Sequence, residues 1–203
     1  MKQLLLTSLF AFSIVSAIAQ QANDDLKALT PKGYKILFQY DSDLNLDSLK
    51  DKILILGTDR SMGDSLLRSI LPEGTNILKR PVVLLLRQKD GSLKRVTRND
   101  QAIAQTLANI DPFSGIKCEP GVFTIEHIVN NGPTHCTIAS RFEWSPKQND
   151  WLLKIYSHTC IFTTAGAGSN EDGYKEKTPK NFGKIPFGKY KYPMEIEIDE
   201  WGQ

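Results

Sequence analysis

The chain has 203 residues, of which 24% are charged and 40% hydrophobic, and its formal net charge is +2 at pH 7. This near-neutral balance gives no electrostatic basis for binding nucleic acid or an anionic membrane surface. A chain of this length is typical of a single domain, and it can bury a hydrophobic core without relying on disulfide bonds.

Residues 1–19 have the composition of a signal peptide. Lys2 provides the positive start, residues 4–18 carry no charge, and Ala17-Ile18-Ala19 has the small residues of a cleavage site. No cysteine follows the cleavage site to carry a lipid anchor, and no later apolar stretch is long enough to cross a bilayer. We therefore expect an exported protein, periplasmic or extracellular and without a transmembrane segment, whose single domain spans residues 20–203.

An acidic segment, Asp-Leu-Asn-Leu-Asp-Ser-Leu-Lys-Asp at 43–51, lies between apolar runs at 34–40 and 53–56. The two runs predict strands, so the segment is expected to be the loop of a hairpin. Calcium takes six to eight oxygen ligands, and oxygen-bearing residues at alternate positions of a loop can face one ion. The predicted calcium ligands are the side chains of Asp43, Asn45, Asp47 and Asp51 and the carbonyl of Leu49, with Asp41 as a possible outer ligand.

The pattern D-x-N-x-D-x-x-x-D between two strands resembles the calcium loop of FG-GAP/VCBS-type repeats, which are known from β-propellers and integrin heads. Those loops usually have glycine at the sixth position, where the backbone turns sharply. Ser48 stands there in this chain, and it is expected to strain the turn or weaken ion binding. An EF-hand is not expected, because its twelfth position needs a bidentate Glu and Leu54 stands there.

The alternative for this loop is a metal-free polar turn, because Asp and Asn favour turns for their own backbone hydrogen bonds. An all-oxygen ligand set argues against zinc or copper. The chain has no convincing internal repeat, so a full multi-bladed propeller is not expected.

The remaining elements of the N-terminal half follow from hydrophobic patterning. The apolar run at 81–86 predicts a central strand buried on both faces. A hairpin turn at 89–92 then leads to a more exposed partner strand at 93–97. Short helical segments are expected up to Leu29, within 64–71, and from Asn99 or Asp100 to Ala108.

The C-terminal half predicts further strands. Residues 121–127 alternate as a half-buried strand, and 136–144 and 151–160 are long strands joined by a turn at 145–150. Residues 163–173 are rich in glycine and small polar residues, which predicts a flexible loop, and 178–187 are expected to lie extended along the domain surface. Residues 163–190 are therefore expected to be loop-rich. The predicted fold class is mainly β, with α+β as the alternative: antiparallel sheets and hairpins with one or two short helices.

The order of these motifs resembles a group of uncharacterised exported bacterial proteins with an FG-GAP/VCBS-like calcium-loop hairpin. That group has no established activity, so the resemblance implies the β-rich fold and the calcium loop but no reaction. The motifs that carry it are the acidic hairpin and residues 80–86, 89–92, 98–100, 111–116, 121–127 and 178–185.

Of the three cysteines, Cys136 and Cys160 lie at equal distances, to within one residue, from the centre of the 145–150 turn. In a regular hairpin they lie opposite each other or nearly so, so we predict a disulfide bond between them in an oxidising compartment. A register slip of one residue would place them on opposite faces. Cys118 is left over, buried or free.

A zinc site is the alternative for this region. His158 and Cys160 share one strand face, whereas the adjacent His135 and Cys136 do not. No C-x-x-C or H-E-x-x-H spacing supports zinc. Glu126 and His127 are strand neighbours that face opposite ways, so we predict no catalytic residue and no organic cofactor.

The leading functional hypothesis is an exported, non-enzymatic binding or envelope-associated protein, monomeric, with an unknown protein or glycan partner and a calcium-stabilised loop. A hydrolase of envelope or extracellular polymers is the first alternative, and it requires Glu126, His127 or His158 to share a pocket with another acid. An inhibitor or immunity-type protein is the second, and it would show as an exposed apolar patch, with Trp201 or Phe187 as candidate members.

Overall fold

The computed structural model describes residues 26–58, 80–103, 112–131, 134–164 and 167–192. The predicted signal peptide, the predicted helix at 64–71, most of the predicted helix after Asn99, and Trp201 lie outside these ranges. Among the described residues, no helix is long and apolar enough to span a membrane.

Four strands form the first sheet, in the order of the sequence and antiparallel throughout. They are β1 (Lys35–Ser42), β2 (Asp51–Gly57), β3 (Val82–Arg87) and β4 (Leu93–Asn99). β2 and β3 are the central strands, and both faces of each are covered. Ile53 and Ile55 of β2 pack into one hydrophobic cluster, and Leu54 and Leu56 pack into another beside the helical residues 26–29. The prediction that the apolar run at 81–86 is buried on both faces is confirmed.

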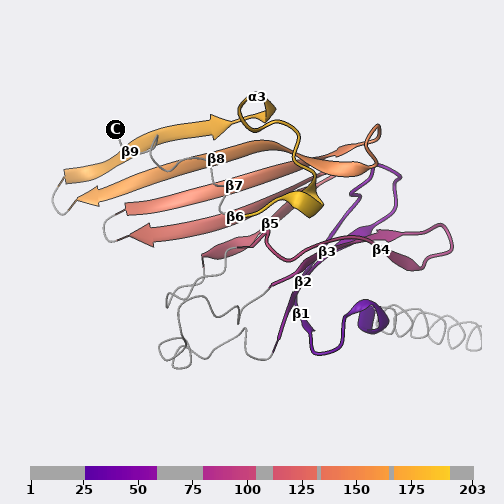
Figure 1. The fold of residues 1–203 in the computed structure, drawn as a ribbon. Helices are drawn as coiled ribbons and strands as arrows, with labels where there is room; N and C mark the ends of the chain where they lie inside the picture. The colour runs from indigo at the N-terminus through magenta and orange to yellow at the C-terminus, as the bar shows by residue number, and fades with distance from the viewer. Residues whose placement is uncertain (1–25, 59–79, 104–111, 132–133, 165–166, 193–203) are drawn as a thin grey trace, which may run out of the picture.

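Five strands form the second sheet, again antiparallel and in sequence order. They are β5 (Phe113–Glu119), β6 (Val122–Asn131), β7 (Thr134–Ser145), β8 (Asp150–Thr164) and β9 (Ala167–Lys177). In Figure 1 its long strands extend well past the four-stranded sheet. The described residues contain no closed barrel and no propeller, so the prediction of a mainly β fold in a single domain is confirmed.

The larger hydrophobic core lies between the two sheets. The four-stranded sheet contributes aliphatic side chains, and the five-stranded sheet contributes the fully buried rings of Phe123, Phe142 and Trp151. Phe123 and Phe142 stack on neighbouring strands with ring centroids 5.1 Å apart. Such aromatic cross-strand pairs stabilise a sheet by roughly 0.2–1 kcal/mol each.

The segment after β9 completes this core. It contains α3 (Pro179–Phe182) and η2 (Phe187–Lys189). Phe187 is fully buried, and its ring meets those of Phe123 and Phe142 edge-on at 5.1 Å each. The prediction that residues 178–187 lie along the surface is therefore wrong for Phe187. Its neighbours are turn-forming residues, so no periodic pattern marked it as core.

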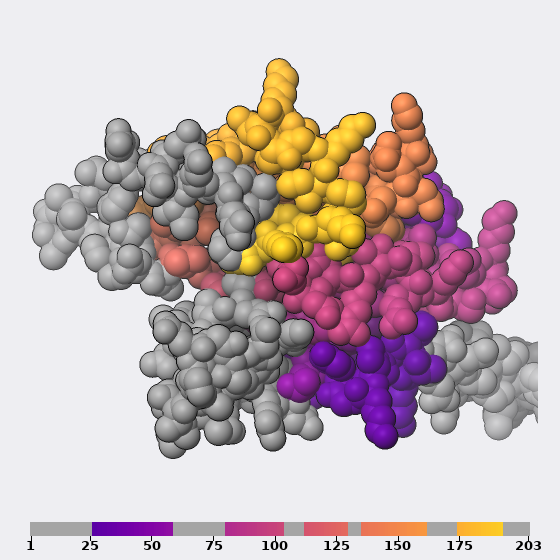
Figure 2. All heavy atoms as spheres, viewed as in Figure 1, coloured from indigo at the N-terminus to yellow at the C-terminus, as the bar shows by residue number. Residues whose placement is uncertain are grey.

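Backbone contacts fix this segment against both sheets. Leu153 of β8 donates its N–H to the carbonyl of Ile185 at 2.9 Å. The Asn99 side chain at the end of β4 donates to the carbonyls of Phe187 and Tyr190, the latter at 2.8 Å. Figure 2 shows the C-terminal atoms (yellow) lying directly against those of the β3–β4 region (magenta).

The predicted flexible loop at 163–173 is wrong, because β8 continues to Thr164 and β9 covers Ala167–Lys177. β9 is the edge strand of a long hairpin with β8, and its register is interrupted in two places. Strand pairing there uses backbone N–H and C=O groups, which any residue supplies, so composition gave no indication of it.

Candidate functional site

The acidic loop, residues 43–50, lies where the two sheets meet. The Asp43 carbonyl accepts a hydrogen bond from the N–H of Gly121 at 2.7 Å, in the turn between β5 and β6. The Leu44 carbonyl accepts one from Nε1–H of Trp151 at 2.8 Å, at the start of β8. Leu44 itself is fully buried in the core. The loop therefore joins the β1–β2 hairpin to one end of the five-stranded sheet.

A close packing contact accompanies these bonds. Gly121 has a φ of +72°, and a Cβ at this position would come within 3.0 Å of the Leu46 side chain. Glycine is therefore required here both for its backbone conformation and for the approach of Leu46. Leu46 covers the β5–β6 turn, although more than half of its surface remains exposed.

Aspartate carboxylates in the loop accept hydrogen bonds from the N–H groups of the loop backbone. The Asp43 carboxylate accepts the N–H groups of Asp47 at 3.0 Å and Ser48 at 2.9 Å, and the Asp47 carboxylate accepts that of Leu49 at 2.9 Å. Asn45 donates its amide N–H to Asp47 at 2.9 Å. Leu49 thus contacts the Asp47 carboxylate through its N–H group. Calcium ligation by its carbonyl stays a prediction.

Two residues of the loop adopt left-handed backbone conformations: Leu46 has a φ of 63° and Ser48 a φ of 70°. Such conformations cost a residue with a Cβ roughly 1 kcal/mol relative to glycine. Ser48 is the position where FG-GAP-type loops usually have glycine, and the sharp turn expected at this position is present in the structure.

Three of the predicted ligands converge. One carboxylate oxygen from each of Asp43, Asp47 and Asp51 lies within 4.8 Å of the others. Ligands that surround calcium at roughly 2.3–2.6 Å are separated by up to about twice that distance, so this spacing fits one ion. Each carboxylate oxygen has two acceptor positions, so the observed N–H bonds leave capacity for a cation.

Asp51 is the buried member of the cluster, with no exposed surface. Its two oxygens accept the N–H groups of Leu44 and Arg87, each at 2.8 Å. Burial raises the pKa of the Asp51 carboxyl above its ordinary value, these two N–H bonds oppose the rise, and the charges of Asp47 and Asp43 add to it. A bound cation would favour the ionised form, so this donor set fits calcium.

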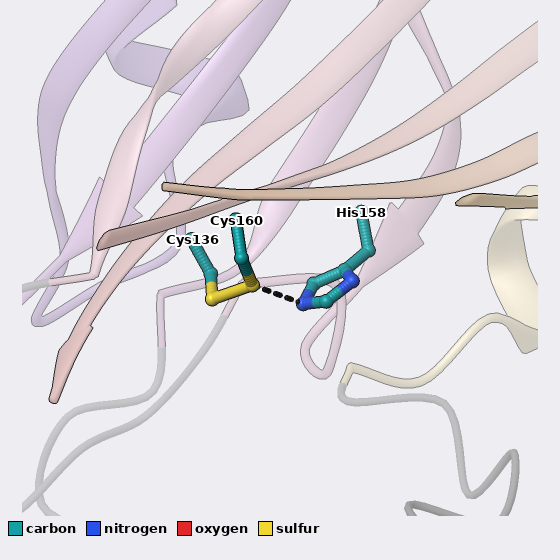
Figure 3. Close-up of a disulfide and its surroundings, with 3 residues drawn as sticks. All are labelled: Cys136, His158 and Cys160. Atoms are coloured by element: carbon teal, nitrogen blue, oxygen red, sulfur yellow. Dashed lines mark hydrogen bonds between the residues drawn. A yellow bond between two sulfur atoms is a disulfide. The ribbon is translucent and has the colours of Figure 1, made fainter. Parts of the chain in front are cut away.

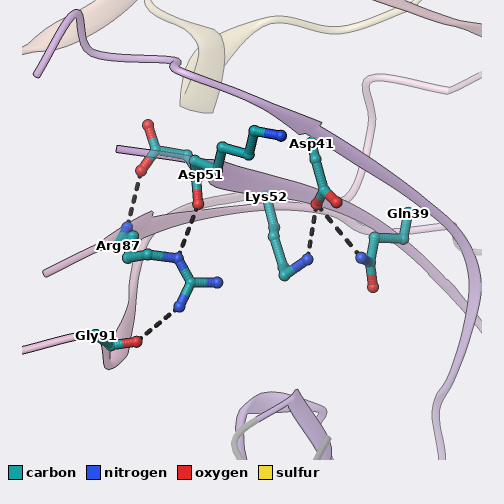
Figure 4. Close-up of polar contacts among 7 residues, drawn as sticks. Gln39, Asp41, Asp51, Lys52, Arg87 and Gly91 are labelled. Atoms are coloured by element: carbon teal, nitrogen blue, oxygen red, sulfur yellow. Dashed lines mark hydrogen bonds and ion pairs between the residues drawn. The ribbon is translucent and has the colours of Figure 1, made fainter. Parts of the chain in front are cut away.

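The rim of the loop is fixed by neighbouring basic side chains (Figure 4). Arg87 donates to the carbonyls of Lys50 at 3.0 Å and Gly91 at 2.7 Å. Lys52 lies 2.7 Å from the carboxylate of Asp41. Asp41 thus forms an ion pair with Lys52 and is not one of the three aspartates whose carboxylates converge in the loop.

At the opposite end of the five-stranded sheet, Cys136 of β7 lies directly across from Cys160 of β8. Their sulfurs are at disulfide distance, 2.00 Å, and their Cα atoms are 4.1 Å apart. A bulge at Arg141/Phe142 produces this pairing: the turn pairs Ser145 with Asp150, and the extra residue in β8 shifts the register by one. Without the bulge, Cys136 would lie opposite Thr159.

His158 lies on the same face of β8 as Cys160, and its Nε2 is 2.7 Å from the Cys160 sulfur (Figure 3). The zinc alternative requires both sulfurs as thiolates, whereas here they are joined to each other. Cys118 is the free cysteine among the described residues. Burial, together with the charge of Asp41, raises the pKa of its thiol to about 11, so it is protonated at neutral pH.

Glu126 and His127 point to opposite faces of β6, as predicted for strand neighbours. Glu126 is paired with Lys117 at 2.7 Å on the outer face. His127 is fully buried and stacks on Tyr192, with ring centroids 3.8 Å apart. His158 shares the inner face with His127 but lies two strands away, across Ile138. The three residues thus do not form an acid–base cluster.

Comparisons of this chain with protein-family models, with curated proteins and with solved structures found no match. The FG-GAP/VCBS-like relationship therefore stays a prediction based on the loop motif.

Proposed function

We propose that this protein is an exported, non-enzymatic β-sandwich binding module whose acidic loop binds calcium. The observation that carries the proposal is the convergence of Asp43, Asp47 and the fully buried Asp51 within 4.8 Å at the junction of the two sheets. Like charges at this separation repel, and a divalent cation would convert that repulsion into attraction.

The position of the loop indicates what calcium would do. The loop carbonyls hold Gly121 and Trp151, and the Asp51 carboxylate holds the backbone of Arg87. An ion that fixes the loop would therefore stabilise the packing of the two sheets. Calcium would thus have a structural role, and such a role supports a binding module over an enzyme.

The hydrolase alternative needs an acid beside His127 or His158. Glu126 lies on the opposite face, and Tyr192 covers His127, so the arrangement of these residues favours the binding module. The apolar patch expected for an inhibitor cannot include Phe187, because that side chain is fully buried.

The test is thermal unfolding of the purified protein in excess calcium and in excess chelator. A ligand present at about 100 times its Kd stabilises the folded state by about 2.7 kcal/mol, so we expect calcium to raise the Tm by several degrees. Asp47→Ala is expected to abolish the shift.

Asp90→Ala is the matched control, because Asp90 is an exposed loop aspartate that also accepts a backbone N–H, at 2.9 Å from Ser92. It should retain the full shift. Identical melting curves in calcium and chelator, or an equal loss of the shift in both variants, would count against the calcium site.

A further inference from the structure

The Cys136–Cys160 bond is chemically asymmetric, because only one of its sulfurs has an imidazole beside it. Nε2 of His158 is 2.7 Å from the sulfur of Cys160. A disulfide sulfur carries no hydrogen, so Sγ of Cys160 is the acceptor and Nε2–H of His158 is the donor. Figure 3 shows the imidazole pointing at Cys160 from the side opposite Cys136.

The two cysteines also differ in how much of their surface is exposed. Cys160 is buried, with 5% of its surface exposed, whereas Cys136 is half-buried and more accessible. A thiolate that attacks a disulfide approaches one sulfur and expels the other, and the expelled sulfur leaves faster when its negative charge is stabilised. Accessibility selects Cys136 for attack, and the His158 hydrogen bond selects Cys160 as the leaving group.

We propose that this disulfide is a site of thiol–disulfide exchange with an external thiol. The thiolate attacks Sγ of Cys136 and forms a mixed disulfide there. The Cys136–Cys160 bond breaks, its electron pair goes to Sγ of Cys160, and that sulfur takes the proton from Nε2 of the His158 imidazolium, which is left as the neutral imidazole. A second external thiolate then releases Cys136, so two external thiols are oxidised to a disulfide while the protein disulfide is reduced.

The residues that face His158 are consistent with Cys160 as the leaving group. Ile138 of β7 and Lys175 of β9 lie directly opposite it on either side, and Tyr156 and Cys160 are its same-face neighbours on β8. Lys175 is the charged member of this set, and a positive charge nearby favours a thiolate.

The first experiment measures the rate of reduction of the native protein by dithiothreitol, followed by alkylation and mass spectrometry. His158→Gln is expected to slow reduction by about tenfold or more at pH 7, in line with the loss of a positioned acid. The ratio of wild-type to variant rates should fall as the pH rises, because the imidazolium form is the stronger acid.

His135→Gln is the matched control. His135 is adjacent to Cys136, and its side chain is exposed on the other face of β7. This variant should be reduced at the wild-type rate, and both oxidised variants should keep the wild-type Tm. A His158→Gln protein that is reduced as fast as wild type at every pH would overturn the role of His158.

The second experiment locates the mixed disulfide. The protein is exposed briefly to glutathione, quenched with acid and mapped by peptide mass spectrometry. The adduct is expected on Cys136. An adduct on Cys160 would overturn the proposed polarity.

Discussion

At one end of the five-stranded sheet the acidic loop joins both sheets through hydrogen bonds, whereas at the other end a covalent bond joins β7 to β8. The loop end depends on three carboxylates, one of which is fully buried. The disulfide end depends on two sulfurs and a neighbouring imidazole. The same long strands are therefore secured by carboxylate hydrogen bonds at one end, where we propose a calcium site, and by a disulfide bond at the other.

This difference indicates that each end can be perturbed without the other. The loop contacts Gly121 and Trp151, close to the β5–β6 and β7–β8 turns, and the disulfide lies near the far ends of β7 and β8. Sites this far apart with no shared partners usually contribute additively to stability.

The largest effect is expected from Asp51→Ala. It removes the acceptor of two N–H groups, of which that of Leu44 is buried and that of Arg87 is part-buried. Unsatisfied buried donors cost roughly 1–3 kcal/mol each, so the free energy of unfolding should fall by about 4 kcal/mol. Urea denaturation in chelator measures this loss apart from calcium.

Asp43→Ala is the control for this variant, because the N–H groups that Asp43 accepts are exposed and can bond to water instead. It should cost about 1 kcal/mol or less in chelator. Equal losses in the two variants would mean that burial of Asp51 does not set its contribution.

The next largest effect is expected from the double variant Cys136→Ser/Cys160→Ser. A disulfide that closes a loop with a sequence separation of 24 residues stabilises a protein by roughly 2–4 kcal/mol. The calcium-induced Tm shift should be the same as in the wild type, because the loop is at the other end of the sheet. A reduced shift would show that the two ends are coupled.

A smaller effect is expected from pH. Because burial raises the pKa of Asp51 in the folded state above its ordinary value of 3.8, the folded state holds the proton more tightly than the unfolded state. In chelator, the contribution of Asp51 is therefore most favourable below pH 3.8 and is lost as the pH rises through the raised value.

With calcium present the sign is expected to reverse, because calcium at the proposed site would bind the ionised carboxylate. The difference in Tm between calcium and chelator should grow as the pH rises from 3.8 towards 7. Asp51→Asn should remove this pH dependence. A calcium shift that is constant over the whole range would contradict a role for Asp51 as a ligand.

The smallest effect is a gain from Ser48→Gly. Ser48 has a φ of 70°, and relief of that backbone conformation should stabilise the protein by about 1 kcal/mol. Leu46→Gly relieves a similar φ of 63° but loses the contact over Gly121, so it should give no net gain. Denaturant titration of both variants separates backbone strain from packing.

The parts of this structure that could be predicted from the sequence are local. Turn residues and apolar patterning predicted the β1–β2, β3–β4 and β7–β8 hairpins, and the predicted acidic ligands are close together in the sequence. Cys136 and Cys160 lie within one residue of symmetric positions about a turn, and their pairing was predicted from that spacing. The bulge at Arg141/Phe142 that aligns the two cysteines has no signature in the residues around it.

The parts that could not be predicted depend on contacts between distant segments. The backbone of Arg87 bonds to Asp51 from 36 positions away, and the indole of Trp151 bonds to Leu44 from 107 positions away. Neither contact changes a local pattern. β9 was missed because its pairing uses the backbone, and Phe187 was missed because a single ring among turn residues carries no periodicity.

The late position of the core residues Phe187 and Tyr190 affects how the protein is made. A chain that stops before Ile185 already contains all nine strands found among the described residues, but the rings of Phe123 and Phe142 still lack the partners that cover them. The two sheets therefore cannot finish closing until the segment with Phe187 and Tyr190 has packed between them. Until then, exposed aromatic surface favours aggregation of the unfinished chain.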